Sequence, residues 1–137
     1  MTEHTLQPKP TLIAAVPQLF VADIVASCAF FTGKLGFGVE FIYGDPPFYA
    51  QVIRDGASLA LRHVDRPVLD GLAAAMKGDV DMLSASIAAD DLAALFQEFQ
   101  AAGVVFHQTL RTEPWGARTF VVQDPDGNLL LFAGSAD

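Results

Sequence analysis

Two histidines, His63 and His107, are the side chains best placed to do acid–base or metal chemistry in this chain. His63 follows Arg62 and His107 follows Phe106, each in a segment that reads as a strand. Adjacent strand residues point to opposite faces, so one member of each pair is expected to face a cleft. Structural roles are favoured for both histidines. The chemical alternatives are acid–base catalysis by His107 and a metal site built from both histidines with Glu40.

Aromatic and cationic side chains form a second candidate set, suited to binding a planar ligand. Trp115 is the single tryptophan and lies in a predicted loop, where it either anchors the loop or offers a stacking platform. Phe48 and Tyr49 add rings on one predicted strand. Arg62 and Arg118 either meet an acidic group on a ligand or form surface salt bridges, and the second interpretation is favoured.

Nucleophilic and phosphate-binding chemistry find little support. Cys28 lies on the apolar face of a predicted helix, which favours a buried, inert thiol. A lone cysteine excludes an internal disulfide and fits a reducing, cytoplasmic location. Asp124 and Asp126 belong to an Asp-Pro-Asp-Gly turn, where carboxylates cap backbone N–H groups. Glu98 and Glu113 are expected to be solvated.

Composition narrows the class of protein and of partner. The 137 residues are 52% hydrophobic and 18% charged, which indicates one globular domain with a sizeable core. The net charge of −8 argues against a nucleic-acid partner and is compatible with a cationic small molecule. No apolar run is long enough to span a membrane, and the N-terminus does not resemble a signal peptide.

The elements that must position these residues follow one order twice. A flexible tail (1–10) precedes a first unit (11–64) of a strand, a helix capped by Asp23 and stopped by Gly36, and three strands. A linker (65–81), with helical turns near 69–76, leads to a second unit (82–134). There the order is again strand, helix and three strands, with Asp90 or Asp91 as the cap and Gly103 as the stop.

The repeat itself is the strongest pattern in the sequence. Gly36 and Gly103 are 67 residues apart, and the turn glycines Gly56 and Gly127 are 71 apart. This spacing predicts an α+β fold with two βαβββ modules. Their curved mixed sheets are expected to enclose a cleft on one side and to carry the helices on the other. Pro17 in the first strand indicates an edge position, a bulge or the end of a ladder.

Two stretches carry a family resemblance. FVADIVASCAFFTGKLGFGVEF (20–41) resembles the first half of vicinal oxygen chelate proteins, a superfamily of glyoxalase I, extradiol dioxygenases, and fosfomycin- and bleomycin-resistance proteins. PWGARTFVVQDPDGNLLLF (114–132) resembles the end of the second half, and the chain is closest in type to the bleomycin-resistance proteins. The resemblance covers roughly residues 12–134. In the bleomycin-binding relatives, a Trp-Gly in this segment borders the drug pocket, which here corresponds to Trp115.

The resemblance also locates the metal-ligand positions of the family's enzymes. In the first strand the ligand stands seven residues before the helix cap, which gives Val16, and the equivalent fifth-strand position is Ser84 or Leu83. In the last strand the ligand position comes four residues after the turn glycine, at Leu131. In the fourth strand the corresponding position is near Ala60 or Leu61. None is His, Asp, Glu or Cys, so no metal and no cofactor is expected.

Three functions follow. The favoured one is a homodimeric, metal-free binding protein that sequesters an aromatic or cationic antibiotic. The alternative is a glyoxalase-like lyase or a dioxygenase that holds a divalent metal on non-standard ligands. A cofactor-free enzyme or sensor with His107 as the tuned group is the third. The ligand-binding residues predicted for the favoured function are Trp115, Phe48, Tyr49, Arg62, His63, Phe106, His107, Arg118 and Leu131.

Overall fold

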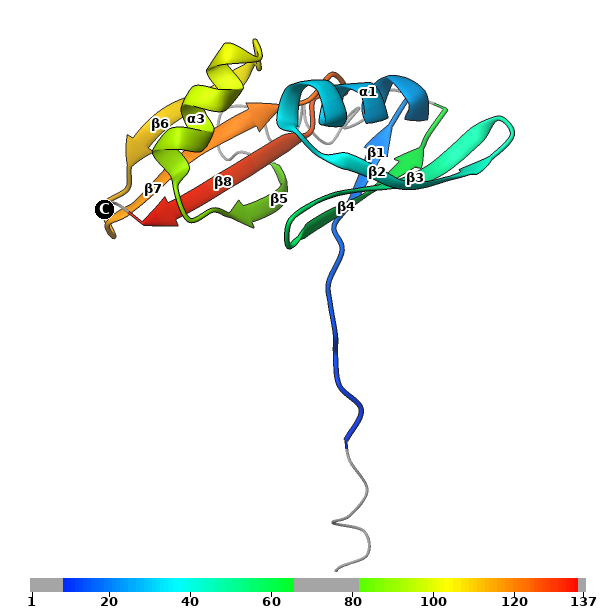
Figure 1. Cartoon of the computed structure of the whole chain (residues 1–137), viewed down its shortest axis with the longest axis horizontal. Helices are drawn as coiled ribbons and strands as arrows, with labels where there is room; N and C mark the ends of the chain where they lie inside the picture. The colour runs from blue at the N-terminus through cyan, green and yellow to red at the C-terminus, as the bar shows by residue number, and fades with distance from the viewer. Residues whose placement is uncertain (1–8, 66–81, 136–137) are drawn as a thin grey trace, which may run out of the picture.

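The computed structural model describes residues 9–65 and 82–135, and in them the predicted order of elements is present twice (Figure 1). The first module consists of β1 (Gln18–Val21), α1 (Ile24–Leu35), β2 (Gly38–Gly44), β3 (Pro47–Arg54) and β4 (Ala57–His63). The second consists of β5 (Leu83–Ala88), α3 (Leu92–Ala101), β6 (Phe106–Thr112), β7 (Ala117–Gln123) and β8 (Leu129–Ser135). The predicted helical turns at 69–76 lie outside the described residues.

Each module forms its own four-stranded mixed sheet. The strand orders are β1-β4-β3-β2 and β5-β8-β7-β6. In both sheets the first strand runs parallel to the last strand of its module, and the other pairs are antiparallel. This equivalence confirms the duplicated α+β fold. Neither helix of the described residues is long and apolar enough to cross a membrane.

Both helices begin where the sequence predicts. The Asp23 carboxylate accepts a hydrogen bond from the Ala26 N–H at 3.0 Å, and Asp91, rather than Asp90, does the same for Ala94 at 3.1 Å. Each bond satisfies an N–H group that the first helical turn leaves free. Gly36 (φ 75°) ends α1 in the left-handed conformation that glycine adopts without strain.

The first strand is shorter than the sequence indicates. Residues 11–17 were expected to be part of it, but β1 begins at Gln18. Pro17 marks the end of the ladder: its carbonyl accepts from the Ala60 N–H at 2.9 Å, and none of the described residues before it pairs with β4. Residues 9–16 run away from the body as an extended arm (Figure 1).

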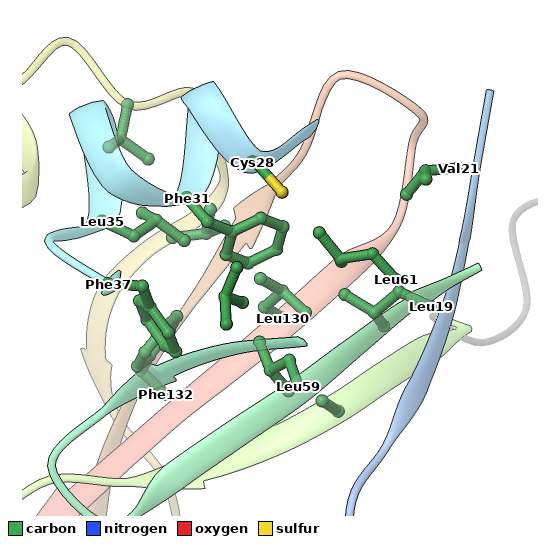
Figure 2. Close-up of a cluster of buried hydrophobic side chains, with 14 of the residues drawn as sticks. Leu19, Val21, Cys28, Phe31, Leu35, Phe37, Leu59, Leu61, Leu130 and Phe132 are labelled. Carbon is green, nitrogen blue, oxygen red and sulfur yellow. The ribbon is translucent and has the colours of Figure 1, made fainter. Parts of the chain in front are cut away.

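One hydrophobic core serves both modules. Phe31, Leu35 and Phe37 approach Leu130 and Phe132 of the other module (Figure 2). Further rings extend it on the second module's side, with Phe99 edge-on to Phe132 at 5.3 Å between centroids. The buried Cys28 belongs to this core, and burial raises the pKa of its thiol, as expected for an inert cysteine.

Polar contacts join the two modules around this core. Arg54 donates from both terminal nitrogens to the Glu98 carboxylate, at 2.7 and 3.1 Å, and from one of them to the Leu35 carbonyl at 2.8 Å. Lys34 donates to the Ala102 carbonyl at 2.7 Å. Glu98 is exposed, as the sequence indicates, but it also forms this ion pair with Arg54, which the sequence did not predict. The hydrogen bonds from Arg54 are the main cause that holds the pKa of Glu98 below its usual range.

The Asp-Pro-Asp-Gly turn is a further link between modules. Asp124 is buried and accepts from the N–H groups of Asp126 and Asn128, at 2.9 and 2.8 Å, as the turn chemistry predicts. Burial is the main cause that raises the pKa of Asp124. Two side chains of the turn also contact the first module. Asp126 accepts from the Ala22 N–H, and Asn128 donates to the Phe20 carbonyl.

Candidate functional site

The face of the first sheet turned away from α1 carries most of its rings. Ala50, Val52, Leu59 and Leu61 point into the core, so the residues that alternate with them point to the opposite, outer face. Across the four strands, one row of paired residues there is Phe20, Arg62, Tyr49 and Tyr43. Together with Phe41, these four residues form what we call the aromatic face.

The rings of the aromatic face are close enough to act as one surface. Phe41 lies 5.2 Å from Tyr43 and 5.8 Å from Tyr49, between ring centroids. The Arg62 guanidinium lies over the Tyr49 ring, 5.6 Å from its centroid. Tyr43 is 60% exposed and Phe20 is half-exposed. An exposed cluster of rings with a stacked cation is suited to binding a flat molecule.

The outer face of the second sheet is different. Leu131 lies there, because its neighbours Leu130 and Phe132 point into the core. Leu131 pairs with Ser86 on one side and with Val121 on the other, and Val121 pairs with Gln108. This row of Ser86, Leu131, Val121 and Gln108 is apolar at its centre and contains no ring.

A closed polar network lies beside this row. Gln108 donates to the buried Thr119 hydroxyl at 2.9 Å, and that hydroxyl donates to Glu113 at 2.7 Å. Arg111 donates to the same carboxylate at 3.0 Å. The Thr119 bond is the largest cause that lowers the pKa of Glu113. Glu113 is therefore not simply solvated, as the sequence suggested, but ordered on the outer face.

The strand register does not pair the predicted metal-ligand positions with one another. The residue paired with Ala60 is Gln18, not Val16, and the residue beside Leu131 is Ser86, not Ser84. Ser84 instead donates to the Asn128 side chain at 3.0 Å. In the described parts of the chain no three His, Cys, Asp or Glu side chains gather into a group that could hold a metal ion.

Both ring nitrogens of His63 have hydrogen-bond partners within the protein. One ring nitrogen lies 2.9 Å from the Ala22 carbonyl oxygen and the other 2.7 Å from an Asp65 carboxylate oxygen. Both partners accept hydrogen bonds, so only the imidazolium satisfies both at once. The bond to Asp65 is the main cause that raises the pKa of His63. An imidazole with both nitrogens engaged in hydrogen bonds is a poor general base.

The other predicted ligand-binding residues are dispersed. Phe106 points into the core, with its ring 4.8 Å from that of Phe96, so it is unable to line an outer-face site. Phe48 alternates with Tyr49 and therefore lies on the opposite side of the sheet, against Gly44. His107 is exposed on β6, in the other sheet from His63. The Nε of Arg118 is buried and has no acceptor among residues 9–65 and 82–135.

Within one chain, Trp115 is not part of the aromatic face. Trp115 is 75% exposed in the turn between β6 and β7. Figure 1 shows that turn at the opposite end of the molecule from the β2–β3 hairpin, which carries Tyr43 and Tyr49. The structure thus joins Tyr49 with Arg62 and places Trp115 and Leu131 on the second module. Phe20 was missed, because only its pairing with Arg62 across β1 and β4 places it in this row.

Comparisons with known proteins agree with this fold. The family model described as Glyoxalase/Bleomycin resistance protein/Dioxygenase superfamily matches residues 11–132. A bleomycin resistance protein of Geobacillus stearothermophilus is 27% identical over 131 residues, covering 88% of this chain and 96% of that protein. A bleomycin resistance protein of Staphylococcus aureus matches to the same extent.

Solved structures give the same result. A bleomycin-binding protein from bleomycin-producing Streptomyces verticillus, solved with copper(II)-bleomycin, is 26% identical with a TM-score of 0.69, over 90% of this chain and 97% of that chain. A bleomycin resistance determinant encoded on transposon Tn5 is 23% identical with a TM-score of 0.72, over 90% and 98%. The chain therefore belongs to the glyoxalase/bleomycin resistance protein/dioxygenase superfamily.

Proposed function

We propose that this protein binds an aromatic, cationic small molecule of the bleomycin class, without a metal of its own, and does not transform it. The observation that carries the proposal is the aromatic face, where two exposed rings, two half-buried rings and one stacked guanidinium lie on one side of a sheet. A protein of this size gains nothing in stability from exposing such rings, so a surface of this kind points to a partner.

Charge and similarity support the same ligand class. The net charge of −8 favours the approach of a cation. Relatives that align over most of the chain are named for bleomycin resistance, and one solved relative at 26% identity was crystallised with copper(II)-bleomycin. Two outer-face pairs, Gln18–Ala60 in the first sheet and Ser86–Leu131 in the second, offer an amide, a hydroxyl and two aliphatic groups. Such a set lacks the charged or imidazole ligands that a divalent metal prefers.

We propose further that two copies assemble each binding site. Trp115 and the aromatic face lie at opposite ends of one chain, so a second copy is the simplest source of the missing wall. A two-fold dimer would place the second sheet of one copy opposite the first sheet of the other, and would do so twice.

Tryptophan fluorescence tests the proposal directly, because Trp115 is the only tryptophan. Metal-free bleomycin titrated into the protein should quench or shift its emission saturably. Tyr49→Ala should weaken binding by about two- to tenfold, since a stacked ring contributes roughly 0.5–1.5 kcal/mol. Val25→Ala, an exposed site on α1, is the matched control. Binding unchanged by Tyr49→Ala would remove the aromatic face from the site.

Metal analysis tests the other half of the proposal. The purified, untagged protein should contain no stoichiometric transition metal, and calorimetric titration with Zn²⁺, Ni²⁺, Mn²⁺ and Fe²⁺ should show no tight site. Stoichiometric binding that His63→Gln or His107→Gln abolishes would contradict a metal-free site. It would instead favour a lyase or dioxygenase with unusual ligands.

A further inference from the structure

Arg62 lies between two aromatic residues on the outer face of the first sheet. In the strand register its neighbours are Phe20 of β1 on one side and Tyr49 of β3 on the other. Its guanidinium lies over the Tyr49 ring, 5.6 Å from the ring centroid. Stacking on a ring holds the plane of a guanidinium and leaves its N–H groups pointing outward from the edges. The ring therefore orients the Arg62 side chain without occupying its hydrogen-bond donors.

Two other arginines show what Arg62 lacks. Arg54 donates to the Glu98 carboxylate at 2.7 Å. Arg111 donates to the Glu113 carboxylate at 3.0 Å. Within the part of the chain that the structure describes, the Arg62 guanidinium has no such acceptor, although the sequence contains 16 acidic residues against 8 lysines and arginines. An exposed, oriented guanidinium with free donors is suited to an oxyanion from outside the chain.

A carboxylate lies at the other edge of the same face. Gln51 alternates with core residues of β3, so its side chain lies on the outer face. It donates to Glu40 at 2.9 Å, which places that carboxylate on the outer side of β2. Because β3 lies between β2 and β4, Arg62 and Glu40 are two strand spacings apart, roughly 10 Å in the direction across the strands. A positive and a negative group thus flank the rings of the aromatic face.

We propose that Arg62 binds a carboxylate of the ligand and so selects flat molecules that carry an acidic group beside the ring. The inference rests on the binding function proposed above and adds a group that the ligand must carry. A guanidinium meets a carboxylate through two parallel N–H···O bonds that lie in one plane, and the Tyr49 ring already holds this plane. A ligand ring beside Tyr49 would bring its acidic substituent to the edge of that guanidinium.

The charge of the whole protein favours a zwitterion over a simple anion. A net charge of −8 repels an anion at long range, whereas the charges of a zwitterion cancel at a distance. At the surface the two charged groups are bound separately, the acidic one by Arg62 and the cationic one by Glu40. The spacing of these side chains then sets a separation of roughly 10 Å between the two groups of the ligand.

Matched naphthalene probes test the role of Arg62. Naphthoate and naphthamide share one flat ring and differ in the charge of a single group. Their dissociation constants are measured by NMR on the isotope-labelled full-length protein, with the Nε–H signal of Arg62 as the local readout. Wild type should bind naphthoate about fivefold more tightly than naphthamide, the upper range for an exposed ion pair.

Variants of Arg62 separate its charge from its shape. Arg62→Gln should remove the preference by weakening naphthoate alone, and Arg62→Lys, which keeps the charge without the planar fork, should retain part of it. Lys34→Gln removes the same charge on the helix side of the sheet and should leave the preference unchanged. Equal affinities in wild type, or an equal loss for both probes in Arg62→Gln, would overturn the selection by Arg62 while leaving the aromatic face as a binding surface. If Tyr49→Ala changes neither affinity, the aromatic face and this inference fall together.

A third probe tests the opposite edge. An aminomethyl naphthoate with its two charged groups at opposite ends of the ring should bind more tightly than naphthoate. Glu40→Gln should remove this gain and leave the affinity for naphthoate itself unchanged. A gain that survives in Glu40→Gln would refute the binding of the cationic group by Glu40 and would leave the carboxylate selection by Arg62 in place.

Discussion

The two sheets share one backbone plan and differ in what their outer faces carry. In the first sheet, Phe41, Tyr43 and Tyr49 stand beside Arg62 and leave rings in solvent. In the second, the equivalent strands carry aliphatic side chains and a network in which Thr119 and Glu113 satisfy their neighbours. The first face is built to be covered by something else, whereas the second is largely complete by itself. The duplicated backbone fixes positions, and the side chains alone decide the use of each face.

Breaking the network of the second face should have the largest effect on stability. Thr119→Val preserves the shape of a buried side chain but removes the hydroxyl that links Gln108 to Glu113. Leaving buried polar groups without partners should cost about 1–3 kcal/mol in the free energy of unfolding, measured by urea denaturation. Tyr43→Phe on the open aromatic face should stay within about 0.5 kcal/mol of wild type. Equal losses in the two variants would show that the faces do not differ in this way.

Separating the two modules electrostatically should have a smaller effect. Glu98→Gln removes the charge that Arg54 meets across the module boundary, at a cost of at most about 1 kcal/mol because both groups keep solvent contact. Asp55→Asn is the control, since Asp55 lies 3.9 Å from Arg54 and is almost fully exposed.

The pH dependence of this ion pair has a definite sign. The folded-state pKa of Glu98 lies below its ordinary value of 4.5, so the pair stabilises the protein above that value. The stabilisation is lost as the pH falls through the lowered folded-state pKa. The difference in unfolding free energy between wild type and Glu98→Gln should therefore shrink in acid. A difference that stays constant down to acid unfolding would exclude the ion pair as its source.

The smallest expected change concerns His63 in the first module. Asp65→Asn should bring the pKa of His63 back toward 6.5, because the carboxylate bond is the main cause of its rise. Titration of the imidazole by NMR measures this shift. The stabilisation from the charged ring is full below pH 6.5 and is lost as the pH rises through the raised folded-state pKa. If Asp65→Asn leaves the titration of His63 unchanged, then the Ala22 carbonyl, and not Asp65, is the cause of the raised pKa.

Local signals explain why the fold could be predicted. Asp23, Gly36, Asp91 and Gly103 mark helix ends through bonds and dihedral angles that depend only on nearby backbone. Because the module is duplicated, each of these local signals occurs twice in the sequence. Sequence alone placed β1 too early, because the strand needs a partner over its whole length and Pro17 ends the ladder.

The candidate site was harder to predict because it depends on register and on contacts between modules. The strand register pairs Gln18, and not Val16, with Ala60, and it pairs Ser86, and not Ser84, with Leu131. Spacing along the sequence does not reveal such a pairing. Phe106 reads like any aromatic strand residue, and its partner Phe96 comes from the helix that covers the sheet. The Arg54–Glu98 pair joins residues 44 positions apart, which no local pattern reveals.

The turn at Asp124–Asn128 has a consequence for how the protein is made. Synthesis delivers the first module well before the last strand. At the end of β1, the Ala22 N–H donates to Asp126, and the Phe20 carbonyl accepts from Asn128, both in the turn before β8. Phe31 and Phe37 are likewise covered only when Leu130 and Phe132 of β8 are present. A nascent chain therefore holds an unfinished first module until β8 has been made, and a ribosome stalled before the final turn would present that module's apolar side to the chaperones of the cell.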